Sequence, residues 1–186
     1  AITTLIGVII HTGDFKFDHT PVDGQVLEFN KFAEYGDLGV LCLLADSTNA
    51  ERPGFTPSER MVGQTFDEEF RYAKHRIIVA TFSSNVHRIQ QVIDTAVKYD
   101  RKVAVIGRSM VNVVNIAKEL GYLKVPDGVL IDIDETHNYT PEKVVIITTG
   151  SQGEPMSALT RMACLLYTAD AADDLTRVDR GWRRIL

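Results

Sequence analysis

Two acidic residues stand where carboxylates could bind a metal ion. Asp14 follows the apolar run from Leu5 to Ile10, at the end of the polar turn 11–14, and Asp46 follows a second apolar run, from Gly39 to Ala45. Such short apolar runs are typical of strands. Carboxylates at strand ends can ligate metals or orient a catalytic histidine, although each alone is more often a turn former. A catalytic zinc site needs about three protein ligands plus water, so these two carboxylates do not complete one.

The other side chains that ligate metals form no recognisable cluster. The sequence has no HxH or HExxH motif, and its two cysteines lack a ligand-like spacing. This cysteine content fits a reducing compartment and argues against a disulfide framework. The scattered residues are His11, His19, His75, His87, His137, Cys42 and Cys164.

Three polar loops follow predicted strands and open predicted helices. Their candidate ligand-binding residues are Ser84, Asn85 and His87 in the first, Arg108 in the second, and Ser151, Gln152, Gly153 and Glu154 in the third. Helix starts attract phosphate through free N–H groups and the helix dipole, so three such loops predict a phosphate-lined groove. The alternative for any single loop is an ordinary helix cap or tight turn. None is a Walker loop or a GxGxxG dinucleotide fingerprint.

The same loops belong to an alternating pattern of strands and helices. Apolar strands are expected within 77–80, 102–106 and 144–148, each followed by an amphipathic helix. Strands that are apolar on both faces, separated by such helices, indicate an α/β fold with a parallel, helix-flanked, Rossmann-like sheet. Right-handed crossovers would place all three loops at one edge of that sheet, where open α/β sheets bind ligands.

An additional helix is expected just before this pattern. Thr56 can cap it, Pro57 suits its first position, and Glu59 can complete a capping box. Apolar side chains then recur every four residues and give the helix one buried face. They are Val62, Phe66 and Phe70.

Net charge and the lengths of the apolar runs bear on two possible partners, nucleic acid and membrane. The net charge of −5 gives no global sign of nucleic-acid binding, so an anion site must depend on local basic residues and loop amides. No apolar run reaches the ~20 residues that cross a bilayer, so we expect no membrane partner. Ala1 to Ile10 lack the basic start of a signal peptide and are expected to form a strand.

Five segments, in order, resemble ribonuclease J enzymes, which belong to the β-CASP family of the metallo-β-lactamase superfamily. Residues 11–18 (HTGDFKFD) resemble the fourth conserved segment of the metallo-β-lactamase domain, and residues 43–51 (LLADSTNAE) resemble the first β-CASP motif. Residues 80–88, 107–110 and 149–156 are similar to later ribonuclease J segments. Five ordered segments over about residues 5–163 make this resemblance specific.

The resemblance implies a role for each candidate residue. Asp14 would bridge two catalytic zinc ions, and Asp46 would orient a histidine supplied later in the chain. Ser84, Asn85, His87 and the loop from Ser151 to Glu154 would face RNA, beside Arg108. The family implies a cytoplasmic zinc-dependent 5′–3′ exo- and endoribonuclease of RNA decay and rRNA maturation. It would prefer RNA with a 5′-monophosphate and work as a homodimer or homotetramer.

The resemblance also implies a domain organisation. Residues 1–60 are expected to be part of a metallo-β-lactamase αβ/βα layer whose apolar faces lack their covering partners, and residues 61–163 a β-CASP domain. The HxHxDH segment is expected upstream of Ala1 and further histidines downstream of Ala163, so we expect this piece to be inactive alone. Residues 164–186 resemble translated sequencing-adapter sequence rather than the family; a divergent natural helix is the alternative.

A second class of function stays open on the sequence alone. A non-catalytic RNA- or nucleotide-binding α/β module would keep the three loops and dispense with a metal site. The presence of both Asp14 and Asp46 favours the nuclease, because a pure binding module has no need for both carboxylates.

Overall fold

The computed structural model describes residues 1–48, 50–155 and 157–163. Asn49, Met156 and the predicted foreign tail 164–186 lie outside the described residues. The chain divides into two units, Ala1–Val62 and Gly63–Leu186. The assignment of residues 1–60 to a partial metallo-β-lactamase domain stays a prediction.

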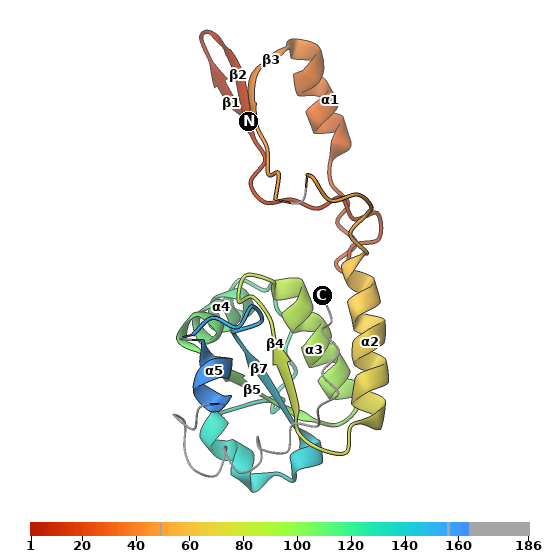
Figure 1. The fold of residues 1–186 in the computed structure, drawn as a ribbon, viewed down its shortest axis with the longest axis vertical. Coiled ribbons are helices and arrows are strands. Elements are labelled where there is room, and N and C mark those ends of the chain that lie inside the picture. The colour runs from red at the N-terminus through yellow and green to blue at the C-terminus, as the bar shows by residue number, and fades with distance from the viewer. Residues whose placement is uncertain (49, 156, 164–186) are drawn as a thin grey trace. The chain divides into compact units, whose positions relative to one another are not determined.

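The first unit is a three-stranded mixed sheet with one helix (Figure 1). Strands β1 (Ile2–Thr4) and β2 (Gly7–His11) form an antiparallel hairpin, and β3 (Val40–Leu44) pairs with β2 in parallel after helix α1 (Phe29–Leu38). The strand predicted within Leu5–Ile10 is confirmed by β2, but the residues before it form a second strand that was not predicted. The turn lies at two apolar residues, so no polar residue marks it in the sequence.

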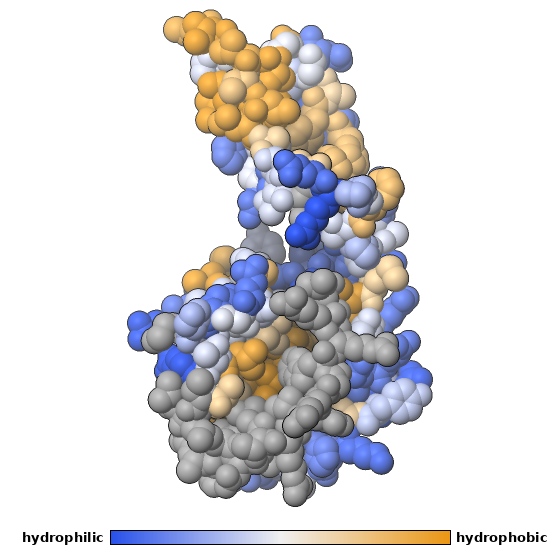
Figure 2. Space-filling model, viewed as in Figure 1, coloured by the Kyte–Doolittle hydropathy of each residue, from blue (hydrophilic) through white to orange (hydrophobic). Residues whose placement is uncertain are grey.

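The apolar side chains of this unit are largely exposed. Every residue of β3 is exposed, and among the described residues β3 pairs with β2 and with no other strand. Figure 2 shows hydrophobic residues gathered over this sheet. Among the strands, the hairpin turn and α1, the largest exposed fractions are those of Leu5, Ile6, Leu38, Ile2 and Leu43. Exposed apolar patches of this kind are typical of interaction surfaces.

Helix α2 (Glu59–Tyr72) begins later than predicted. Its first N–H group, on Glu59, donates to Asp18 Oδ2 (3.0 Å), and the next, on Arg60, donates to Ser58 Oγ (3.2 Å). The predicted capping role of Thr56 was therefore wrong. A carboxylate from an earlier loop satisfies the helix start, and a pattern of neighbouring residues cannot reveal such a cap.

The second unit is the predicted parallel sheet. Its strand order is β4-β7-β5-β6, and every described pair in it is parallel. The strands are β4 (Ile77–Ala80), β5 (Lys102–Ile106), β6 (Leu130–Ile131) and β7 (Val144–Thr148). The helices are α3 (Val86–Lys98), α4 (Arg108–Glu119), α5 (Ala158–Ala163) and the 3-10 turns η1 (Ile133–Asn138) and η2 (Pro141–Lys143).

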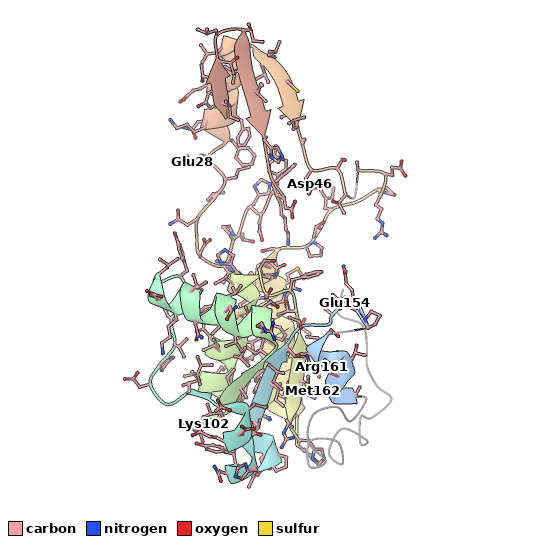
Figure 3. The ribbon with its side chains drawn as sticks, turned by 90° about the vertical axis from the view of Figure 1, so that its left-hand side faces the viewer. Glu28, Asp46, Lys102, Glu154, Arg161 and Met162 are labelled. Atoms are coloured by element: carbon pink, nitrogen blue, oxygen red, sulfur yellow. The ribbon has the colours of Figure 1, made fainter. Side chains whose placement is uncertain are left out.

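The core of this unit has a layer on each face of the sheet. Strand β7 is buried along its whole length, as the all-apolar run predicted. On one face Ala104, Ile106, Val144 and Ile146 pack with Ala158 and Met162 of α5; Figure 3 labels Met162. Helices α3 and α4 bury their own apolar stripes.

None of the helices in the described part of the chain combines the length and the apolar character that crossing a bilayer requires.

Candidate functional site

Parallel pairing of β2 and β3 brings the two predicted acidic loops together. The register pairs His11 with Leu44, and the Thr12 N–H group continues the ladder by donating to the Leu44 carbonyl (3.0 Å). Both strands therefore end side by side. The loops that carry Asp14 and Asp46 leave the sheet at the same edge; Figure 3 labels Asp46 on its loop.

Asp46 is a half-buried, hydrogen-bonded carboxylate. Its Oδ1 accepts from the Thr48 hydroxyl (2.7 Å) and from the Thr48 N–H group (3.0 Å). These bonds, with smaller contributions from the N–H groups of Phe15 and Ser47, hold the pKa of Asp46 below its ordinary value. Asp46 is thus kept ionised.

Asp14 differs from Asp46 in that its side chain is exposed on the loop after β2. An exposed carboxylate can accept a metal ion without loss of a buried bond. Across residues 1–48, 50–155 and 157–163, however, no group of three or more His, Cys, Asp or Glu side chains could hold a metal. The described residues thus bring no such group of three together with Asp14.

In the second unit, the three predicted loops meet at one edge of the sheet. The Thr81 N–H group, just after β4, donates to the Thr148 carbonyl at the end of β7 (2.9 Å). Gly107, just after β5, lies against the third loop and the start of α5: a Cβ added there would be 3.2 Å from Thr149 Oγ1 and 3.4 Å from Ala158 Cβ. The predicted convergence of the loops is confirmed.

The first loop uses Asn85 as a helix cap. Asn85 Oδ1 accepts from the Arg88 N–H group (3.1 Å), and Asn85 rather than Ser84 is the N-cap of α3. The Val86 N–H group donates to the Ser84 carbonyl (3.0 Å). The side chains of Ser84 and His87 are exposed. The alternative that Asn85 is a helix cap is therefore confirmed. A role in RNA binding for Ser84, Asn85 and His87 stays a prediction.

The second loop has the least satisfied helix start. Gly107, with a φ of 106°, is the N-cap of α4 and provides no side-chain cap. Arg108 is exposed at the first helical position. The amides at the start of α4, with a basic residue at its first position, suit an anion better than the capped start of α3 does.

The third loop is braced internally and presents its predicted residues outward. Gly150 has a φ of 112°, and a Cβ there would lie 2.5 Å from Ser157 Oγ, so only glycine fits. Ser157 Oγ accepts from the Thr160 N–H group (3.2 Å), and the Thr160 hydroxyl donates to the Glu154 carbonyl (2.9 Å). Ser151, Gln152, Gly153 and Glu154 are all exposed, and Figure 3 labels Glu154.

Sequence reasoning missed two hydroxyl groups at these edges. Thr12 Oγ1 lies between the two acidic loops, where it accepts from the Asp46 N–H group (3.1 Å). Thr81 is 1% exposed, and its Oγ1 has no hydrogen-bond partner among the described residues. A threonine after a strand is too common to single out, and the partner of Thr12 is remote in sequence.

Comparison with known proteins agrees with this arrangement. A family model described as ribonuclease J, beta-CASP domain, matches residues 74–168. The chain is 52% identical over 163 residues to Ribonuclease J of Synechocystis sp., which covers 88% of the chain and 26% of that protein. It is 53% identical over 163 residues to Ribonuclease J of Helicobacter pylori, a match that covers 88% of the chain and 24% of that protein. It is 53% identical over 162 residues to Ribonuclease J of Thermus thermophilus, a match that covers 87% of the chain and 28% of that protein.

The chain thus spans about a quarter of the length of the curated relatives it matches. The family match extends to residue 168, past Ala163, into residues that the structure does not describe, and the origin of the tail stays a prediction. The matched segment covers just over half of the chain and includes the parallel sheet from β4 to β7. The chain belongs to the ribonuclease J family, and its parallel sheet is part of the family's β-CASP domain.

Proposed function

We propose that this chain is part of a metal-dependent ribonuclease that hydrolyses RNA phosphodiesters. The observation that carries the proposal is the meeting of the Asp14 and Asp46 loops at the ends of adjacent parallel strands. The relatives are named Ribonuclease J, which supports RNA as the substrate. A carboxylate pair at one sheet edge is what a hydrolytic metal site needs from this part of the chain.

The finer features of the proposal follow from the family resemblance. The intact enzyme is a cytoplasmic 5′–3′ exonuclease and endonuclease that acts in RNA decay and rRNA maturation. It prefers RNA with a 5′-monophosphate and assembles as a homodimer or homotetramer. The exposed loops beside β4, β5 and β7 support an RNA-facing role for this part of the enzyme.

The proposed cofactor is a pair of zinc ions in the intact enzyme. Asp14 would provide one of the bridging ligands, and Asp46 would orient a histidine from elsewhere in the protein. The described residues provide no further ligand group. We therefore expect this chain alone to be inactive, because one carboxylate makes too few of the bonds that a zinc ion requires.

Zinc binding by the 186-residue chain tests this view. Equilibrium dialysis should find no tight zinc binding that depends on Asp14, because the remaining ligands are absent from the described residues. Asp14→Ala and the unchanged chain should retain the same small amount of zinc. Stoichiometric zinc in the unchanged chain that disappears in Asp14→Ala would contradict the proposal.

The RNA-binding part of the proposal rests on the three converging loops. Ser84, His87 and Arg108 present exposed side chains at one edge, beside the outward-facing loop 151–154. Polar and basic groups of this kind contact the sugar-phosphate backbone, which carries little sequence information. RNA binding should therefore be weakly sequence-specific and should weaken as salt rises.

Substitution of Arg108 and His87 in the intact enzyme measures this contribution. Arg108→Ala and His87→Ala should each weaken the binding of several unrelated RNA sequences by similar factors. For Arg108→Ala, the slope of log affinity against log salt should also become shallower by about 1, as expected for the loss of one phosphate contact. Asn85→Ala should weaken RNA binding in the same way and should also lower the free energy of unfolding by about 1 kcal/mol, because it removes the cap of α3.

The matched control for Arg108 is Lys118, a basic residue in the last turn of the same helix. Lys118→Ala removes the same charge away from the loops and should leave RNA affinity within about twofold. If Arg108→Ala and His87→Ala lower only the melting temperature and leave RNA affinity unchanged, the loops are scaffold and the RNA-facing assignment fails.

A non-catalytic RNA-binding module is the second candidate. It is favoured by the convergence of the three loops at one edge of the sheet, since RNA binding there needs no metal. Cleavage of RNA by the intact protein distinguishes the two candidates, since only the nuclease produces shortened RNA.

A further inference from the structure

Thr12 is the residue through which the two acidic loops contact each other. Its N–H group donates to the Leu44 carbonyl (3.0 Å) and so holds the end of β2 against the end of β3. Its hydroxyl oxygen accepts from the Asp46 N–H group (3.1 Å) and donates to the Gly13 carbonyl (2.7 Å). One half-buried side chain thus links the residue before Asp14 to the backbone of Asp46.

Asp14 lies two residues after Thr12 on the same loop. Thr12 holds this loop at two points, through its N–H group to the end of β3 and through its hydroxyl oxygen to the Asp46 backbone. The Asp14 side chain itself is exposed.

We infer that Thr12 is a positioning residue for the proposed nuclease. Its hydroxyl fixes the Asp14 loop against Asp46, so that both carboxylates are held in the arrangement that catalysis requires. This rests on the proposed function. Thr12 does not touch the reacting atoms. Its effect should appear in the chemical step, because a displacement of a catalytic group by about 1 Å can cost about 10²-fold in rate.

The first unit contains a matched control. Thr4 Oγ1, at the hairpin turn, donates to the Gly7 carbonyl (2.7 Å) and accepts from the Ile6 N–H group (3.4 Å). Thr4→Val and Thr12→Val therefore remove the same kind of hydroxyl, with one donated and one accepted bond, from the same unit. Only Thr12 is bonded to an acidic loop, so a general loss of stability should affect the two variants alike.

The experiment compares Thr12→Val, Thr12→Ser and Thr4→Val in the intact enzyme that carries this chain. Thr12→Val should lower kcat for RNA hydrolysis by about 10- to 100-fold and leave KM within about threefold, which is the pattern for an interaction needed in the transition state. Thr12→Ser keeps the hydroxyl and should recover most of the lost kcat. Thr4→Val should leave kcat within about twofold.

Amide hydrogen exchange provides a readout that does not depend on activity. In Thr12→Val the segment containing the Asp46 amide should exchange at least about tenfold faster, because that N–H group has lost its acceptor. Thr12→Ser and Thr4→Val should leave this segment unchanged. If the unmodified enzyme does not cleave RNA, the proposed function fails, while exchange at Asp46 still reports on the Thr12 link.

Three results would overturn the inference. Unchanged kcat in Thr12→Val would show that the link does not position the site. An equal loss of kcat in Thr12→Val and Thr4→Val would show a general effect of stability. Unchanged exchange at Asp46 in Thr12→Val would show that the hydroxyl does not hold that loop.

Discussion

Asp14→Ala in the intact enzyme should abolish RNA hydrolysis while leaving the fold intact. Asp14 is an exposed loop residue, so its truncation removes no buried contact and should change stability by less than about 0.5 kcal/mol. A metal contributes several kcal/mol to hydrolysis, and each 1.4 kcal/mol is a factor of ten, so kcat should fall by about 10³-fold or more. Steady-state kinetics and thermal unfolding of the same preparation measure both quantities.

The control for this substitution is Asp37→Ala, which removes another exposed carboxylate of the first unit without touching the acidic loops. It should keep full activity. The zinc content of the purified Asp14→Ala enzyme should also fall below that of the Asp37→Ala enzyme. Retention of both activity and zinc in Asp14→Ala would remove Asp14 from the proposed site.

Arg101→Ala should destabilise the second unit more than any surface substitution. Arg101 is 6% exposed, and its guanidinium donates to the carbonyls of Ala73 (2.7 Å), His75 (3.1 Å) and Phe70 (3.5 Å), while its Cζ lies 5.8 Å from the centre of the Phe70 ring. Removing it leaves carbonyls unpaired at the C-terminal end of α2. We expect a loss of about 3 kcal/mol in the free energy of unfolding, measured by urea denaturation.

Lys102 is the neighbouring control. Its ammonium donates to the Gly128 carbonyl (2.6 Å) from a solvent-exposed position, and Lys102→Ala should cost less than about 1 kcal/mol. Arg101→Lys should recover part of the loss, since it restores one donor but not the planar fork. A loss in Arg101→Ala no larger than that in Lys102→Ala would mean that the α2 end does not depend on this guanidinium.

The parallel sheet was predictable because its signal is local and repeated. Val144 to Thr148 is apolar enough to be buried on both faces, and α3 and α4 carry amphipathic stripes that require a sheet to cover them. The first unit was harder. Its apolar start folds into a hairpin without a polar turn, and helix α1 was not predicted at all.

The features of the candidate site that depend on local patterns could also be predicted, and those that depend on distant residues could not. Asp14 and Asp46 could be proposed from the sequence because each follows an apolar strand, and the parallel pairing of β2 and β3 places their loops together. The cap of α2 by Asp18 and the link from Thr12 to Asp46 were not found. Both join residues far apart in the chain, and short-range patterns carry no information about such bonds. The capping role of Asn85, by contrast, is a local pattern, and it is confirmed.

Cleavage of a 5′-monophosphorylated, end-labelled RNA by the intact protein tests the central claim most directly. The proposal predicts zinc-dependent shortening of the RNA by the unmodified enzyme and about 10³-fold slower shortening by Asp14→Ala, with RNA binding retained in both. RNA that is bound by the unmodified enzyme but stays intact with zinc or any other divalent metal would contradict the nuclease assignment and favour the non-catalytic binding module.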